Sequence, residues 1–159
     1  KENISPRHEE IVLQEAWIDD QTPEELANFI ELLRNEGAYD VSSQTINMKK
    51  NRVGFSIQII LPVEKQEIFR KLWFKYTNTI GLRERTQSRY VLLRRRGECL
   101  TDFGLIKFKQ ILKPNGSVIL KPENDEIFRL QQEHNKKAEE IKKIIKESLG
   151  EFKALEDWK

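Results

Sequence analysis

The sequence is poor in the residues that build several common kinds of site. Its 159 residues include one cysteine, Cys99, and two histidines, His8 and His134. A single cysteine excludes a disulfide framework and a cysteine-rich zinc site. Neither histidine has a metal-ligand partner three or four positions further on, so we expect no histidine-based zinc or nickel site. No serine or cysteine stands in a nucleophile-and-base pattern, so nothing favours covalent catalysis.

Long apolar runs and a large net charge are also missing. No stretch approaches the ~18 consecutive apolar residues of a membrane span. The 28 Lys and Arg residues against 26 Asp and Glu leave a formal net charge of +2. Any binding of anions must therefore depend on a local group of cationic side chains and not on the electrostatic field of the whole protein. The chain opens on Lys1 without a signal-peptide pattern, and we expect a cytoplasmic fragment of a longer protein that binds neither membrane nor nucleic acid.

What is present is a regular succession of strand and helix patterns. Residues 11–18, 39–48, 53–61 and 89–96 have the composition and alternation of strands, and residues 64–76 have helical spacing. Another helix is predicted after Thr22, which would form a capping box with Glu25 around Pro23, and this helix would end at Gly37. The order predicts an α+β, ferredoxin-like fold: an antiparallel sheet with two helices on one face.

Further elements follow this sandwich. Residues 105–112 and 117–121, on either side of a Pro-Asn-Gly turn, predict an extra β-hairpin, and residues 123–149 predict one long charged helix. We therefore expect three parts: a flexible lead-in over residues 1–10, a ferredoxin-like domain with the added hairpin over residues 11–122, and a C-terminal helical arm over residues 123–159.

The densest group of cationic donors falls in the expected turn between two strands. This group, the basic tip, consists of Lys49, Lys50, Asn51 and Arg52. Ammonium, amide and guanidinium groups together meet phosphate oxygens at several angles. A basic turn is also an ordinary way to keep a hairpin soluble, and the residues alone leave the two interpretations even.

Other candidate residues lie at the ends of the predicted elements. Asp19 and Asp20 precede a helix that Thr22 already caps, so they are free to hold a hard divalent cation. The commoner explanation is that acids at this place complement the helix dipole, worth ~0.3–1 kcal/mol. Arg83, after the loop that contains Gly81, suggests a cradle for an anion, although most such loops are connectors.

Three lysines decorate the predicted second hairpin. Lys107 and Lys109 share one strand face by their spacing of two, and Lys121 lies on the neighbouring strand. They are candidates for anion binding, but a solvated strand face is the more common reason for such a pattern.

Four stretches, in this order and at these separations, resemble one known family: "WIDDQTPEEL" (17–26), "MKKNRVG" (48–54), "TNTIGLR" (77–83) and "LKPENDE" (120–126). They are similar to the C-terminal half of the LarC-type nickel insertases, the cyclometallases that complete the nickel-pincer nucleotide cofactor of lactate racemase. The resemblance covers residues 15–130. The chain departs from the family pattern at Trp17, Val53 and Asn124, where asparagine, proline and an aromatic residue are usual.

The resemblance implies an enzyme that inserts nickel into pyridinium-3,5-bisthiocarboxylic acid mononucleotide and consumes CTP with Mn²⁺ or Mg²⁺. It also implies that this half binds CTP, forms a homo-oligomer and works with an N-terminal half of the same protein. On this basis the basic tip, Arg83, Lys107 and Lys121 would contact the nucleotide. Asp19 and Asp20 would reach the metal that the phosphates carry.

Two other functions stay open. A ferredoxin-like module without enzymatic activity would sense a nucleotide or another anion between subunits of an oligomer. An RNA-binding sheet would need exposed aromatic side chains on its central strands, and the aromatics here mostly fall at core-like spacings. The apolar side chains of residues 105–112 exceed what a two-helix sandwich needs, which favours assembly through this hairpin.

Overall fold

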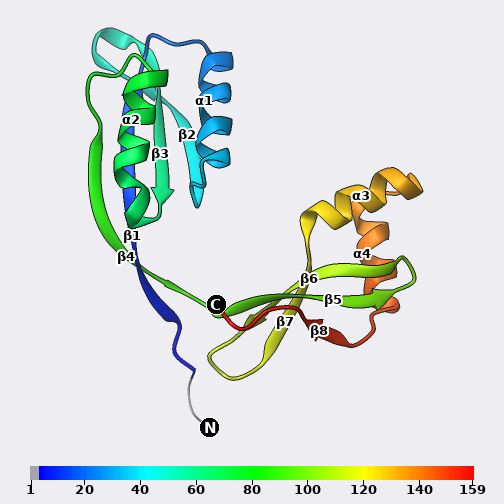
Figure 1. The fold of residues 1–159 in the computed structure, drawn as a ribbon. Coiled ribbons are helices and arrows are strands. Elements are labelled where there is room, and N and C mark those ends of the chain that lie inside the picture. Colours follow the sequence, from blue (N-terminus) through cyan, green and yellow to red (C-terminus); the bar gives the residue numbers. More distant parts are fainter. Residues whose placement is uncertain (1–3) are drawn as a thin grey trace. The chain divides into compact units, whose positions relative to one another are not determined.

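The computed structural model describes residues 4–159, and these residues form two compact units. The first unit is His8–Arg89, and the second is Tyr90–Lys159 together with the described residues before His8. Each unit contains a four-stranded sheet and helices that cover it (Figure 1). Among residues 4–159, no helix is long and apolar enough to cross a membrane.

The first unit has the expected ferredoxin-like order of elements. Its sheet has the strand order β2-β3-β1-β4, with β3 antiparallel to both of its neighbours. The elements, in chain order, are β1 (Arg7–Ile18), α1 (Pro23–Asn35), β2 (Asp40–Asn47), β3 (Val53–Leu61), α2 (Gln66–Tyr76) and β4 (Arg83–Val91). The prediction of an α+β fold with a ferredoxin-like sheet is confirmed.

Local sequence signals explain where α1 begins and ends. The Thr22 hydroxyl accepts a hydrogen bond from the Glu25 N–H (3.2 Å), and the Glu25 carboxylate accepts one from the Thr22 N–H (2.8 Å). This is the predicted capping box, and it satisfies two of the free N–H groups at the start of a helix. The helix ends before Gly37, whose φ of 97° lies in the left-handed region that glycine adopts at low cost.

Both helices of the first unit pack on one face of its sheet. The rings of Phe29 on α1 and Trp73 on α2 meet edge to face with their centroids 5.3 Å apart. A fully buried glutamine, Gln14 on β1, lies beneath them and accepts a hydrogen bond from the Trp73 indole N–H (3.0 Å). Its amide group donates to Glu84 (2.7 Å) and to the backbone carbonyl of Gln66 (3.0 Å). The polar side chain is therefore satisfied where it is buried.

The second unit has the sheet order β7-β6-β5-β8, in which all pairs with a described register are antiparallel. Its elements, in chain order, are β5 (Arg94–Thr101), β6 (Gly104–Leu112), β7 (Val118–Pro122), α3 (Asn124–His134), α4 (Ala138–Glu147) and β8 (Phe152–Ala154). Its buried core consists of Cys99, Ile106, Phe108, Ile127, Leu130, Ile141 and Ile145. The hairpin β6–β7 was predicted from its turn, where Gly116 has a φ of 82°.

Two predicted elements differ from the structure. The single helix expected over residues 123–149 is two helices, because Asn135 adopts a left-handed conformation (φ 49°) that ends α3. The strand expected over residues 89–96 is divided between the end of β4 and the start of β5. In both places a short local break outweighs a favourable composition.

The segment predicted as a C-terminal helical arm, either a solvated arm or an interaction helix, instead covers the second sheet. Ile127 and Leu130 on α3 and Ile141 and Ile145 on α4 are buried in the same core as Phe108. The hairpin expected as an addition to the ferredoxin-like domain belongs to this unit as well. Residues 7–10, expected to be part of the flexible lead-in over residues 1–10, belong to β1, which starts at Arg7. Residues 1–3 lie outside the described part of the chain.

Candidate anion-binding site

The basic tip is a tight turn between β2 and β3. The Met48 N–H donates to the Arg52 carbonyl (2.7 Å), which closes the turn, and Lys49–Asn51 form a single 3-10 turn between them. Lys50 and Asn51 both have positive φ values, 60° and 58°. A side chain other than glycine in this region costs ~1–3 kcal/mol, and strain of this kind is typical of functional turns. The turn holds its cationic groups in a defined arrangement.

A glycine allows the end of β1 to approach this turn. Gly54, the second residue of β3, lies opposite Ile46. A Cβ atom added to it would lie 2.5 Å from the Met48 sulfur and 2.9 Å from the Ile18 carbonyl oxygen. It would also lie 3.3 Å from Cβ of Asp19. Only a residue without a side chain permits this packing. Gly54 thus brings the acidic end of β1 next to the basic tip.

The two segments enclose a pocket of about 520 Å³, the tip pocket. Its lining residues are Trp17, Asp19, Asn47, Met48, Lys49, Lys50 and Arg52. Three cationic side chains therefore face one carboxylate. The Asp19 carboxylate lies 3.5 Å from the Arg52 guanidinium, and the Asp19 side chain is only 27% exposed. Such a pocket attracts an anion, while a single carboxylate remains for a cation bound to that anion.

An exposed indole ring forms one wall of the tip pocket. Trp17 is 52% exposed and lies on the sheet face opposite the helices, because Gln14 on the same strand points to them and faces alternate along a strand. The Arg83 guanidinium lies over the ring, 4.5 Å from its centroid. Glu15 accepts hydrogen bonds from the Trp17 indole N–H (3.2 Å) and from Arg83 (2.8 Å). The ring is held in place on a strand rather than on a loop.

The same contacts set the charge state of Glu15. The hydrogen bond from Arg83 lowers the pKa of this carboxyl below its ordinary value of 4.5, although partial burial opposes the shift. Glu15 is therefore an anion at neutral pH and offsets the charge of Arg83. Consequently Arg83 acts first as a support for Trp17, and its net contribution to anion binding is smaller than its charge suggests.

The structure brings together some of the predicted site residues and not others. Lys49, Lys50, Arg52 and Asp19 line one pocket, whereas Asp20 and Asn51 are exposed and do not line it. Arg83 reaches the pocket only through Trp17. Across residues 4–159 there is no cluster of three or more His, Cys, Asp or Glu side chains able to hold a metal. A cation at Asp19 would therefore need most of its ligands from the bound anion or from water.

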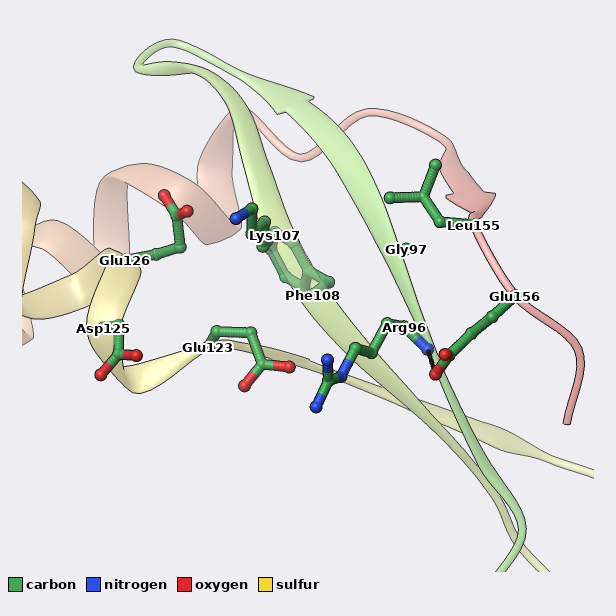
Figure 2. A pocket seen from close by; sticks show the side chains of 9 residues that line it. All are labelled: Arg96, Gly97, Lys107, Phe108, Glu123, Asp125, Glu126, Leu155 and Glu156. Atoms are coloured by element: carbon green, nitrogen blue, oxygen red, sulfur yellow. Dashed lines mark hydrogen bonds between the residues drawn. The ribbon is translucent and has the colours of Figure 1, made fainter. Parts of the chain in front are cut away.

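Lys107 and Lys121 belong to the second unit. Lys107 lines a pocket of about 410 Å³, drawn in Figure 2, together with Arg96 and four carboxylates: Glu123, Asp125, Glu126 and Glu156. Carboxylates outnumber cationic groups there, and like charge repels a triphosphate. We therefore leave Lys107 out of the proposed nucleotide site. Lys121 lines a different pocket, described below.

Comparison with known proteins shows the family of this chain. The family model described as "Nickel insertion protein" matches residues 1–142. The chain belongs to the nickel insertion protein family.

Curated relatives of the family are longer proteins. A putative nickel insertion protein of Picosynechococcus is 35% identical over 153 residues, which is 95% of this chain and 33% of the relative. A relative from Staphylococcus saprophyticus, named pyridinium-3,5-bisthiocarboxylic acid mononucleotide nickel insertion protein, is 34% identical over 74% of this chain and 30% of its own length. The chain thus spans about a third of these nickel insertion proteins.

Solved structures show the same fold. LarC2, described as the C-terminal domain of a cyclometallase involved in the synthesis of the NPN cofactor of lactate racemase, matches with a TM-score of 0.81 and 26% identity. The match covers 89% of this chain and 98% of LarC2. Protein MK0293 of Methanopyrus kandleri, at a TM-score of 0.64 and 18% identity, shares the fold. Within the family, this chain therefore corresponds in fold to a C-terminal domain.

Sequence reasoning missed two parts of the tip pocket. Trp17 was noted only as a departure from a pattern, because nothing in the sequence shows that its ring turns toward a hairpin 30 residues away. Gly54 has a detectable signal: a glycine inside a strand often marks a close backbone approach. Trp17 forms a wall of the pocket, and Gly54 allows the end of β1 to lie close to the basic tip.

Proposed function

We propose that this chain is the nucleotide-binding part of a nickel-inserting enzyme, and that it binds CTP with Mn²⁺ or Mg²⁺ in the tip pocket. The substrates of the whole enzyme would be nickel and pyridinium-3,5-bisthiocarboxylic acid mononucleotide, the compound named for the Staphylococcus saprophyticus relative. One observation carries the proposal: Lys49, Lys50 and Arg52 converge with Asp19 on a single pocket of ligand size.

Each side chain of the pocket has a distinct part in this proposal. Lys49, Lys50 and Arg52 bind the triphosphate, and Arg52 exchanges its present partner, Asp19, for a phosphate oxygen. Asp19 then orients the nucleotide through the hard cation, which neutralises charge on the phosphates. The Trp17 ring offers a flat apolar surface to the base, since base–aromatic stacking contributes ~1–3 kcal/mol.

The proposal includes a homo-oligomer and an N-terminal half of the same enzyme. Leu100 and Leu105 face each other across β5 and β6 and are 61% and 62% exposed, so they offer an apolar patch for association. Ile106 and Phe108, expected in the same role, are instead buried under the helices. We also propose a cytoplasmic location, where a free buried thiol such as Cys99 is ordinary.

Calorimetric titration of this chain with the four ribonucleoside triphosphates, with and without Mn²⁺, tests the nucleotide site. We expect CTP to bind best and to need the cation. Substitution of Lys50 and Arg52 by alanine should weaken binding at least tenfold, or about 1.4 kcal/mol. The matched control is Lys71→Gln, an exposed lysine on α2 that pairs with Glu67 away from the pocket. It should leave the affinity unchanged.

A readout from the pocket wall separates this proposal from the alternatives. Bound base should quench the fluorescence of Trp17 and not that of Trp158, which an arginine also covers in the second unit. Equal affinity in the Lys50/Arg52 variant and in Lys71→Gln would contradict the tip pocket. A further test joins this chain to the N-terminal half of the enzyme. If the joined protein binds CTP but inserts no nickel, the sensing module without enzymatic activity is favoured.

A further inference from the structure

A second pocket, whose charged lining residues are lysines and not mainly carboxylates as in the pocket of Figure 2, lies between β7 and α4. We name it the three-lysine pocket, and its volume is about 460 Å³, within the range of small-molecule sites. Its floor is apolar and includes Leu120, Ile127, Ile145 and Leu149. Leu149 is 39% exposed there. Among residues 4–159, no aspartate or glutamate lines the pocket.

Three lysines surround this apolar floor. Lys142 and Lys146 are one turn apart on α4, and Lys121 reaches the pocket from β7. Within residues 4–159 none of the three has a carboxylate within ion-pair distance, whereas Lys143 on the same helix lies 4.0 Å from Glu147. Two like charges at i and i+4 destabilise a helix by a few tenths of a kcal/mol, so the arrangement does not serve α4 itself.

Helix electrostatics explain only one of the three charges. Lys146 lies in the last turn of α4, where a cation complements the helix dipole. Lys142 lies one turn earlier, and Lys121 is on a strand. Their common feature is the hollow between them, which combines an apolar floor with unpaired positive charge.

We propose that the three-lysine pocket binds a small organic anion with a flat or apolar body, of the size of a mononucleotide. The body would cover the leucine and isoleucine side chains of the floor, and the carboxylate or phosphate groups would meet the three ammonium groups. The class includes pyridinium carboxylate mononucleotides. The pocket is built from residues of the second unit alone. Only one part of the inference rests on the proposed function, namely that the natural ligand is the mononucleotide substrate before nickel is inserted.

The probe for the test is nicotinic acid mononucleotide, a pyridinium carboxylate with a phosphate, titrated into the whole chain and followed by amide chemical shifts. We expect shifts at residues 120–149. The Lys142→Gln/Lys146→Gln variant and the Lys121→Gln variant should each bind at least tenfold more weakly, ~1.4 kcal/mol. Lys143→Gln is the matched control, because its lysine lies on α4 but not in the pocket, and it should bind as the parent does.

Three results would overturn the inference. The first is equal weakening, or none, in the pocket variants and in Lys143→Gln. The second is that reduced nicotinamide riboside, which has no phosphate, carboxylate or ring charge, binds as tightly as nicotinic acid mononucleotide. The lysines would then contribute nothing to the affinity. The third is a shift map confined to residues 17–52, which would place the probe in the tip pocket.

The variants are expected to fold, because glutamine and lysine have similar helix propensities and the substituted side chains reach solvent. Far-ultraviolet circular dichroism and the thermal midpoint check this directly. Failure of CTP to bind while the probe still shifts residues 120–149 would remove the proposed function and leave this site standing. CTP binding without shifts at residues 120–149 on addition of the probe would remove the three-lysine pocket and leave the proposed function standing.

Discussion

The two units share a plan, a four-stranded sheet covered by two helices, but they bury different side chains. Among the described residues the core cluster of the first unit has twelve buried members, including Phe69 and Trp73. The second has seven, of which only Phe108 is aromatic. Because stabilisation grows with the apolar area removed from water, the first unit is expected to be the more stable. Similar topology therefore does not imply similar stability.

The units also place their charged groups differently. In the first unit the basic tip faces a carboxylate across a turn, and the core contains a satisfied polar side chain, Gln14. In the second unit one pocket combines four carboxylates with Arg96 and Lys107, and another has three lysines without a carboxylate among the described residues. A stable frame suits a site that must hold strained backbone at Lys50, since strain persists only where the surroundings fix it.

The largest expected effect is on the core of the first unit. Phe69→Ala should lower the free energy of unfolding of this unit by ~3–5 kcal/mol, because it leaves a cavity beneath α2. Urea unfolding followed by tryptophan fluorescence measures the change. The matched control is Phe128→Ala on α3, whose ring is 62% exposed, and its cost should be within ~0.5 kcal/mol.

Thiol labelling of Cys99 sharpens the same comparison. Burial raises the pKa of this thiol above its ordinary value, so the native protein should react slowly and report opening of the second unit. If the two cores are separate, Phe69→Ala should leave the labelling rate unchanged. A rate that rises with the loss of Phe69 would mean that the units unfold together.

The next effect concerns the packing of the basic tip. Gly54→Ala should cost ~1–3 kcal/mol and weaken CTP binding, because the new methyl group meets Met48 and the Ile18 carbonyl. Gly81→Ala is the control, since an added Cβ there meets no atom within 4 Å. Denaturant midpoints and titration measure both. Equal effects at the two glycines would show that the close approach at Gly54 does not hold the pocket together.

A smaller effect is expected in acid. The hydrogen bond from Arg70, aided by one from Gln14, lowers the pKa of Glu84 below its ordinary value of 4.5. A carboxyl with a depressed folded-state pKa contributes stability that is complete above its unfolded-state pKa and is lost as the pH falls through the folded-state value.

The Glu84→Gln variant tests this contribution. It should be less stable than the parent by about 1 kcal/mol at pH 7 and should approach the parent as the pH falls below 4.5. Unfolding midpoints between pH 7 and pH 2.5 provide the measurement. Parallel curves for the two proteins over this range would contradict the role of Glu84.

The smallest effect is expected on the surface of the second unit. Arg129 on α3 pairs with Glu126 and Glu133 within its own helix, and the Arg129 and Glu133 side chains are exposed to solvent, whereas the Glu126 side chain is only 13% exposed. Exposed ion pairs contribute little, so Arg129→Gln should leave the unfolding midpoint of the second unit unchanged. A clear loss, measured by Cys99 labelling against denaturant, would show that these pairs stabilise the weaker core.

The order of elements in the first unit followed from local signals. The capping box at Thr22 and Glu25, the glycine at position 37 and the alternation in β3 each act over a few residues, and all three were read correctly. The second unit was misread, since the apolar residues of α3 and α4 are sparse among charges. Ile141, Ile144 and Ile145 nevertheless have the spacing of a buried helix face, and this signal argued against a solvated arm.

By itself the sequence determined which residues could bind an anion, because charge and hydrogen-bonding capacity belong to each side chain. It also determined where α1 begins, since a cap is a local structure. Only the tertiary structure decided which candidates meet: Asp19 joins the basic tip while Asp20 does not, and Lys107 lies among carboxylates while Lys121 lies among lysines. Strand register and helix packing decide these neighbours, and both depend on contacts between residues that are distant along the chain.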